Sequence, residues 1–198
     1  MTTNPLDENM KTLHLLSGGL DSTVLLYDLL QNRADVRCVG FEYGQTHHRE
    51  LDAARAITKA LGLSYETVEL ARVFGGSSLL GESGSIVVPN RNMVFLSVAA
   101  AMAEADGREF VTYGCTAEDF DGFPDCRPAF VAAMNAALRA AGLKVSIRTP
   151  YVEMSKRDVA SIGRKLGVPM EATWSCYLGG DEPCGVCDAC KKREAALQ

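Results

Sequence analysis

The chain has 198 residues, of which 47% are hydrophobic and 23% are charged, and its formal net charge is −5 at pH 7. This composition is typical of a folded chain with one sizeable α/β core and a small appendage. The acidic balance argues against nucleic acid as a partner bound through charge. No apolar run has the length of a membrane-spanning helix, so we expect a cytoplasmic protein with no membrane partner.

Strands and helices are predicted to alternate along most of the chain. In order, the pattern predicts a strand over 13–16, a helix over 21–30, a strand over 36–41, a helix over 47–61, a strand over 63–70, a helix over 92–105, a strand over 109–112, a helix over 128–141, a strand over 145–149 and a helix over 155–166. The glycine-rich stretch 74–88 is predicted to form a loop that could cover a site, and 113–127 has no clear period.

This alternation indicates a fold of the α/β class. Strands separated by helices form βαβ units, which give a doubly wound, mostly parallel five-stranded sheet with helices on both faces. We expect residues 1–170 to form this nucleotide-binding domain and residues 171–198 to form a cysteine-rich segment packed on it. Ligands bind such a sheet at the carboxyl ends of its strands, where the strand order changes direction.

The turn after the first predicted strand has the composition of an anion-binding loop. It reads Ser17-Gly18-Gly19-Leu20-Asp21-Ser22 and separates an apolar run from an amphipathic helix. The two glycines allow a sharp turn and a close approach to an anion, and the first N–H groups of the helix point to the same place. The segment lacks the Gly-Lys-Ser/Thr ending of a Walker A loop. The alternative is an ordinary strand-to-helix turn with an Asp or Ser N-cap.

Four of the seven cysteines lie in the last quarter of the chain, at Cys176, Cys184, Cys187 and Cys190. Their spacing, with glycine and proline between them, predicts a knuckle that holds one metal ion in place of a hydrophobic core. Four thiolates are the ligand set of a structural zinc site. An iron–sulfur cluster and four unligated cysteines are the alternatives.

Two further polar segments lie at predicted element boundaries. Tyr43–Glu50 (YGQTHHRE) directly follows the second strand, and its two histidines could also belong to a solvated helix start. In Pro89–Asn92, Arg91 could bind a phosphate or a carboxylate through two hydrogen bonds. Alternatively, Asn90 or Asn92 simply caps the helix that follows.

Another polar segment, Glu118–Arg127 (EDFDGFPDCR), combines carboxylates, aromatic rings and an arginine. Such a set suits a flat, polar heterocycle that carries an anion. Lys156, at the start of a predicted helix, is a candidate contact for pyrophosphate, and a lone surface charge is the alternative.

Together, these residues resemble a known enzyme family. The sequence SGGLDS at 17–22 resembles the PP-loop of the N-type ATP pyrophosphatases, which cleave ATP to AMP and pyrophosphate while they adenylate a substrate. The segments YGQTHHRE, VPNRNMVFLS, EDFDGFPDCRPAF and SCY…CGVCDAC resemble one branch of that superfamily, the 7-cyano-7-deazaguanine synthase (QueC) family. The similarity extends from Leu13 to Arg193.

The resemblance implies an ATP-dependent carbon–nitrogen ligase in the biosynthesis of queuosine-type deazapurines. Its substrates are 7-carboxy-7-deazaguanine and ammonia, and its product is 7-cyano-7-deazaguanine. The carboxylate is adenylated, ammonia gives the amide, and a second adenylation allows dehydration to the nitrile. The resemblance also implies ATP with Mg²⁺, a structural Zn²⁺ on the four cysteines, and a homodimer.

The resemblance also assigns roles to particular residues. Those expected to bind ATP, with the adenine near Phe41, are Leu16, Ser17, Gly18, Gly19, Leu20, Asp21, Ser22, Thr23, Phe41, Arg91 and Lys156. Those expected to bind the deazapurine acid are Tyr43, Gln45, His47, Asn92, Asp119, Phe123, Asp125 and Arg127. Those expected to be catalytic are Asp21, Lys156, Glu118 and Arg127, and the candidates for the general base are His47, Glu50 and Glu118.

The chain departs from the family pattern in two places. The stretch before VPNRN, at 77–88, is short, and the chain ends soon after the knuckle at Gln198. Both differences could alter how the substrate pocket is closed. The alternative function is therefore a divergent relative that stops at 7-amido-7-deazaguanine, or that joins the acid to an amine on another molecule such as a protein.

Overall fold

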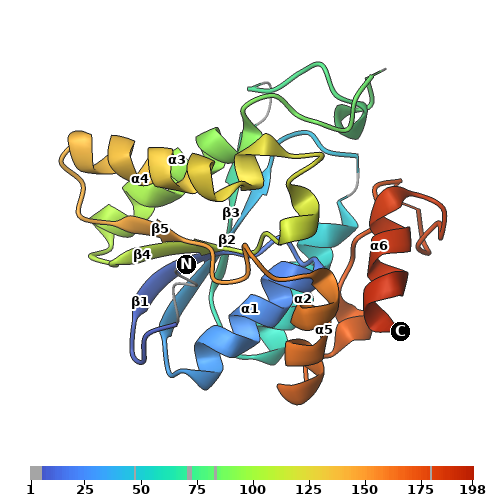
Figure 1. Cartoon of the computed structure of the whole chain (residues 1–198), viewed down its shortest axis with the longest axis horizontal. Helices are drawn as coiled ribbons and strands as arrows, with labels where there is room; N and C mark the ends of the chain where they lie inside the picture. The colour runs from blue at the N-terminus through green and yellow to red at the C-terminus, as the bar shows by residue number, and fades with distance from the viewer. Residues whose placement is uncertain (1–5, 47, 71–72, 83, 179) are drawn as a thin grey trace.

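The computed structural model describes residues 6–46, 48–70, 73–82, 84–178 and 180–198. One parallel sheet has the strand order β3-β2-β1-β4-β5 (Figure 1). The strands are β1 (Lys11–Leu15), β2 (Asp35–Glu42), β3 (Tyr65–Glu69), β4 (Phe110–Tyr113) and β5 (Ser146–Arg148). The predicted doubly wound fold is confirmed.

The helices lie on both faces of the sheet. They are α1 (Leu20–Gln31), α2 (Arg49–Ala60), α3 (Arg91–Ala105), α4 (Pro128–Ala140), α5 (Lys156–Lys165) and α6 (Asp188–Leu197). Figure 1 shows α3 and α4 over one face and α1, α2 and α5 over the other. Each predicted strand and helix is present, with ends displaced by two residues or fewer, whereas α6 was not predicted. No helix in the described part of the chain is long and apolar enough to cross a membrane.

Each face of the sheet has its own apolar core, because successive strand residues point to opposite faces. Leu13, Val39 and Val111 pack under α3 and α4. On the other face, Cys38 packs with the apolar side of α1, which includes Val24 and Leu25.

The strand order sets the position of the site. The central strand β1 pairs with β2 and with β4, so that Leu15 lies opposite both Val39 and Tyr113. The chain winds outward from β1 in one direction through β2 and β3, and in the other through β4 and β5. The carboxyl ends of β1 and β4 therefore form the topological switch point, where a doubly wound sheet binds its ligand.

Short 3₁₀ turns connect the longer elements. They are η1 (Ser78–Leu80), η2 (Ala117–Asp119), η3 (Pro124–Cys126) and η4 (Met170–Ala172). The C-terminal helix α6 packs against α5. The division of the chain at residue 170 stays a prediction.

Candidate active site and metal centre

The loop between β1 and α1 leaves the start of the helix uncapped. Gly18 adopts φ +87°, and a Cβ there would lie 2.1 Å from the carbonyl oxygen of Glu50, so only glycine fits. The N-cap residue is Gly19, which has no side chain to satisfy the first N–H groups of α1. The alternative of an Asp or Ser N-cap is therefore wrong. Ser17 Oγ lies 3.0 Å from Ser22 Oγ, which ties the two ends of the loop together.

Glycine also allows the end of β4 to approach this loop. A Cβ on Gly114 would lie 2.9 Å from the backbone carbon of Asp21 and from the nitrogen of Ser22. Backbone atoms cannot give way as a flexible side chain can. Gly114 therefore lets the two strands of the switch point hold the loop between them.

A buried histidine supports the loop from below. His14 Nε2 lies 2.9 Å from the carbonyl oxygen of Ser22, and Nδ1 lies 3.0 Å from Thr112 Oγ1. Burial lowers the pKa of His14 to about 4, so the ring is neutral at pH 7. The neutral ring donates from Nε2 to the carbonyl and accepts the hydroxyl proton of Thr112 at Nδ1.

Lys156, the first residue of α5, reaches back to the loop. Its Nζ lies 2.5 Å from Asp21 Oδ2 and 3.4 Å from Asp119 Oδ1. Burial opposes the charge on Lys156, but the two carboxylates outweigh it and hold the pKa of the ammonium above its usual range. A cation thus stands beside the uncapped start of α1, where a pyrophosphate would need it.

One of these carboxylates, that of Asp21, suits a magnesium ion. Asp21 Oδ1 is buried and has no hydrogen-bond partner among the described residues. A buried carboxylate oxygen without a donor is costly unless a ligand satisfies it. Carboxylate oxygens are also the protein ligands that Mg²⁺ prefers beside phosphates. Asp21 therefore offers the oxygen for a magnesium ion that accompanies a nucleotide, whereas the Asp119 oxygens already contact Thr116 and Lys156.

Aromatic rings form the wall beyond the end of β2. Phe41 stacks on Phe95 with ring centroids 4.2 Å apart, and Tyr43 meets Phe95 edge to face. Gln45 shapes this wall, because its side-chain oxygen accepts from the Tyr43 N–H at 2.8 Å and its amide donates to the Phe41 carbonyl at 3.1 Å. The wall offers flat apolar surface for a planar ring.

An arginine and a carboxyl group lie beside this aromatic wall. Arg91 Nη1 donates to the Tyr43 hydroxyl at 3.1 Å. Burial raises the pKa of Glu50 to about 8, and the positive charge of Arg91 opposes this shift in part. A carboxyl group that titrates near neutral pH can act as a general acid or base.

The loop before α1, Lys156, the aromatic wall and Arg91 all line one cavity of about 360 Å³. The predicted residues that line it are Leu16, Ser17, Gly19, Leu20, Asp21, Ser22, Phe41, Tyr43, Gln45, Arg91, Asn92, Asp119, Phe123 and Lys156. Leu79 and Ile86 also line it, so the stretch 74–88 covers part of the site as expected. Glu50 is a further lining residue.

Other predicted site residues do not line the cavity. Glu118 Oε1 accepts from the backbone N–H of Lys156 at 2.9 Å and so caps α5. Arg127 is exposed, and its Nε and Nη2 donate to the Phe120 carbonyl at 2.9 and 2.7 Å. Asp125, Gly18 and Thr23 do not line the cavity. His47 lies outside the described residues. The binding and catalytic roles of all the predicted residues stay predictions.

One side of the cavity is lined by residues that the sequence did not predict. Asp188, Ala189, Lys192 and Arg193 line it from one face of α6, and Tyr177 lines it from the position directly after Cys176. The spacing of three and four residues along 188–193 is the signal that could have placed these side chains on one helix face. Gly114 was also missed, because its role depends on a tertiary contact.

The four cysteines of the last quarter converge as predicted. The sulfur atoms of Cys176, Cys184, Cys187 and Cys190 all lie within 4.8 Å of one another. Backbone N–H groups point at them: those of Leu178 and Cys184 donate to Cys176 Sγ at 3.5 and 3.4 Å. Such donors stabilise thiolates, and four thiolates around one point fit a tetrahedral metal ion.

Sequence comparison connects the chain with curated proteins along most of its length. The family model described as "Queuosine biosynthesis protein QueC" matches residues 11–198. The 7-cyano-7-deazaguanine synthase of Trichodesmium erythraeum is 39% identical over 96% of this chain and 96% of its own length. The synthase of Archaeoglobus fulgidus is 39% identical over 95% of this chain and 86% of its own length. The synthase of Synechococcus sp. CC9605 is 43% identical over 93% of this chain and 91% of its own length.

Solved structures share the fold at low sequence identity. The NMN synthetase of Francisella tularensis superposes with a TM-score of 0.60 at 13% identity, over 96% of this chain and 84% of its own. The U34-tRNA thiolase NcsA of Methanococcus maripaludis, solved with its [4Fe-4S] cluster, gives a TM-score of 0.60 at 16% identity. That match covers 97% of this chain and 65% of the thiolase.

Proposed function

Because the chain belongs to the QueC family of queuosine biosynthesis proteins, we propose that it converts 7-carboxy-7-deazaguanine and ammonia into 7-cyano-7-deazaguanine at the expense of ATP. The observation that carries the proposal is the convergence of the 17–22 loop, Lys156 and the aromatic wall in one cavity. That cavity has room for both a nucleotide phosphate chain and a planar base.

The reaction needs two activations of one carbon atom. A carboxylate is a poor electrophile, so its oxygen attacks the α-phosphorus of ATP, which gives an acyl adenylate and releases pyrophosphate. Ammonia displaces AMP to give the amide and loses a proton. The amide oxygen attacks a second ATP, releasing pyrophosphate, and loss of AMP and of the remaining N–H protons leaves the nitrile. Such steps depend on positioning and on neutralising charge.

We assign the phosphate chain to the start of α1. The uncapped N–H groups after Gly19 and the ammonium of Lys156 bind the departing pyrophosphate. Asp21 would hold the Mg²⁺ that accompanies ATP, and that ion would supply charge neutralisation on the phosphates. Phe41 lies beside the adenine.

We assign the deazapurine acid to the part of the cavity lined by Tyr43, Asn92 and Phe123. Asp119, from the same loop as Phe123, accepts N–H donors of the base. Arg127 and Asp125 reach the substrate only after their loop rearranges, because Arg127 is bonded to the Phe120 carbonyl in this structure.

Of the two candidate bases that the structure describes, Glu50 is the better placed. Glu118 caps α5, whereas Glu50 lines the cavity next to Arg91 and has its pKa raised to about 8. Above that pH its carboxylate accepts the proton that ammonia loses as the amide forms.

We assign zinc to the four cysteines. Zinc binds four thiolates tetrahedrally with Zn–S distances of about 2.3 Å, which place the sulfur atoms close together as they are here. A closed site with four protein ligands is structural. Metal analysis of the purified protein should find about one zinc per chain, and iron with acid-labile sulfide would refute the assignment.

Incubation with ATP, Mg²⁺, ammonia and 7-carboxy-7-deazaguanine, followed by mass spectrometry, tests the proposed reaction. We expect the nitrile together with AMP and pyrophosphate. The amide as the only product would favour the divergent relative. No AMP release with this acid would refute the proposal.

A further inference from the structure

One residue touches both the anion loop and the cysteine cluster. The backbone N–H of Trp174 donates to the Gly18 carbonyl at 2.9 Å, within the loop that begins α1. Its ring Nε1–H donates to the carbonyl of Cys176 at 3.0 Å. Trp174 therefore joins the glycine with positive φ to the first of the four metal-ligand candidates.

A second connection starts from α6, the helix that carries the fourth cysteine of the cluster. Lys192 lies two residues after Cys190 on α6, and its Nζ donates to the backbone carbonyl of Glu118 at 3.1 Å. The side chain of Glu118 in turn holds the backbone N–H of Lys156. The ammonium of Lys156 then contacts Asp21 in the anion loop. Each link between the two sites is a hydrogen bond or an ion pair.

Other contacts fix the cluster to the body of the protein. Arg193 Nη2 donates to the Met170 carbonyl at 2.5 Å, and its Nη1 contacts the Thr173 hydroxyl. On the opposite side, Arg49 of α2 pairs with Asp181 and lies 5.5 Å from the centre of the Trp174 ring. These contacts tie Thr173 to α6 and Trp174 to α2, whereas residues 180–183 are exposed. Helix α6 stands close beside α5 (Figure 1).

We propose that the cysteine metal site and the nucleotide site are energetically coupled through Trp174 and Lys192, which act as positioning residues. The proposal rests on the proposed function, because it requires a nucleotide at the 17–22 loop. The residues around the four cysteines have few apolar contacts of their own, so metal binding supplies much of the free energy that orders them. Without the metal, Trp174 and Lys192 lose the fixed positions from which they hold Gly18 and the Glu118 turn.

Coupling between two binding sites is reciprocal. If the metal favours the nucleotide-binding form of the loop, then bound nucleotide must favour retention of the metal by the same factor. The effect on the metal can be measured without any catalytic turnover.

Release of zinc from the intact protein to a chromogenic chelator provides that measurement. The rate is compared with and without Mg²⁺ and an ATP analogue whose α,β-bridging oxygen is a methylene group. We expect the bound analogue to slow zinc release by about fivefold or more. A control with free zinc, chelator and analogue corrects for zinc bound by the analogue itself. Equal release rates would overturn the coupling.

Paired lysine variants test the path. Lys192→Met removes the donor to the Glu118 carbonyl, whereas Lys191→Met changes an exposed neighbour on the same helix. Lys192→Met is expected to keep about one zinc per chain and to bind the analogue about fivefold more weakly. In this variant the bound analogue should no longer slow the release of zinc to the chelator to the same extent. Lys192→Arg is expected to restore both effects. Identical behaviour of the two methionine variants would overturn the role of Lys192.

The fluorescence of Trp174 separates this proposal from the proposed function. It is the single tryptophan of the chain, so its emission is expected to change both when the analogue binds and when zinc is removed. If the intact protein binds the analogue but zinc release is unaffected, the coupling is wrong and the proposed function stands. If the intact protein binds no analogue, both proposals are wrong.

Discussion

Burial of the Glu50 carboxyl group affects both the stability of the fold and the proposed proton transfer. Its carboxyl group lines the cavity, and burial raises its pKa from 4.5 to about 8. A raised pKa means that the folded protein holds the proton more tightly than the unfolded chain does. Ionisation of Glu50 therefore destabilises the fold progressively as the pH rises from about 4.5 to about 8.

Glu50→Gln should remove this pH dependence together with the proposed base. We compare kcat/KM for ammonia as the wild-type value divided by the variant value. This ratio should rise with pH and level off above about 8, where it reaches the order of a hundredfold. Taking the ratio cancels the titration of ammonia itself. Thermal unfolding should also show the variant gaining stability over wild type between pH 5 and pH 8.

Asp52→Asn is the matched control for Glu50→Gln. Asp52 lies on the same helix turn, but its side chain is 70% exposed and pairs with Arg55. The control should leave both the rate profile and the pH dependence of stability unchanged. A flat rate ratio for Glu50→Gln across pH 6–9 would show that Glu50 is not the base.

His14 titrates in the opposite sense. Its folded pKa of about 4 lies below its ordinary value of 6.5, so unfolding takes up a proton and stability is lost as the pH falls between these values. His14→Val should cost about 1–3 kcal/mol at pH 7, because the Ser22 carbonyl and the Thr112 hydroxyl lose their partner. Denaturant unfolding should find a smaller difference at pH 4, and replacement of the exposed His48 by Gln should have little effect at either pH.

At the scale of elements, the contact between the end of β4 and the start of α1 decides whether the anion loop keeps its form. Gly114→Ala would place a methyl group 2.9 Å from backbone atoms of Asp21 and Ser22. Relief of that overlap must move the loop, which costs about 1–3 kcal/mol. Isothermal titration should then find nucleotide affinity reduced about tenfold or more.

Gly75→Ala provides the comparison for Gly114→Ala. A Cβ on Gly75 meets only the side chain of Glu82, at an ordinary 3.7 Å, and Gly75 has no positive φ. Its nucleotide affinity should match that of wild type. Tight binding by Gly114→Ala would mean that the loop accommodates the methyl group and that close packing at the switch point is not required.

Element boundaries followed from local chemistry. Ser155 accepts from the Asp158 N–H at 3.1 Å in the capping box that opens α5, and Pro128 opens α4, as their positions in the sequence predicted. Helix α6 was missed because it begins within the cysteine cluster, whose glycines suggested only turns. Packing against α5 stabilises this segment as a helix.

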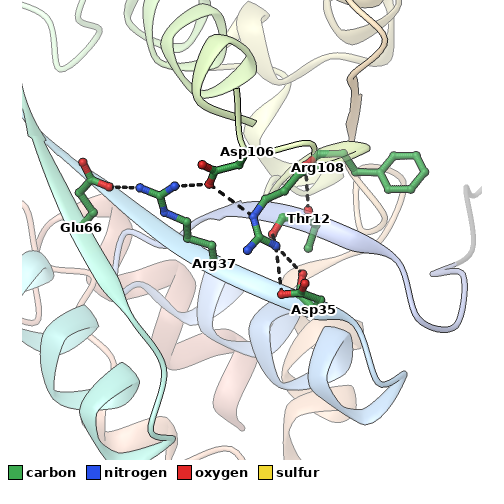
Figure 2. Close-up of polar contacts among 7 residues, drawn as sticks. Thr12, Asp35, Arg37, Glu66, Asp106 and Arg108 are labelled. Atoms are coloured by element: carbon green, nitrogen blue, oxygen red, sulfur yellow. Dashed lines mark hydrogen bonds and ion pairs between the residues drawn. The ribbon is translucent and has the colours of Figure 1, made fainter. Parts of the chain in front are cut away.

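At the scale of the whole molecule, the amino-terminal edge of the sheet is stabilised separately from the site. Figure 2 shows Arg37 between Glu66 and Asp106, and Arg108 beside Asp35 and Thr12. These side chains connect β1, β2 and β3 with the turn before β4. Arg108 Nη1 donates to the backbone carbonyls of Asp35 and Thr12 at 2.9 and 3.2 Å.

Arg108→Met should lower the free energy of unfolding by about 1–2 kcal/mol, because two backbone carbonyls lose a charged donor. Arg37→Met should cost less, at about 0–1 kcal/mol, because the Arg37 side chain is more exposed than that of Arg108 and its ion pairs are screened by solvent and salt. Urea unfolding at low and high salt measures both. The KM for ATP should stay unchanged in both variants. If Arg37→Met lowered the free energy of unfolding equally at all salt concentrations, this account would be contradicted.

The sequence by itself determined the α/β class, the parallel doubly wound sheet, the glycine turn before α1 and the clustering of four cysteines. These features depend on periods of two and 3.6 residues, on glycine conformations and on ligand spacing within short segments, which are local properties. The predicted homodimer and the roles of the site residues stay predictions, which sedimentation velocity and the variants above can check.

Only the tertiary structure decided which polar side chains share the cavity. Glu118 and Glu50 are both acidic residues after strands, but packing turns Glu118 onto the start of α5 and leaves Glu50 facing the cavity. The lining by Lys192, the support from His14 and the contact between Trp174 and Gly18 join residues far apart in the chain. Such contacts depend on the relative placement of whole elements, which no local pattern records.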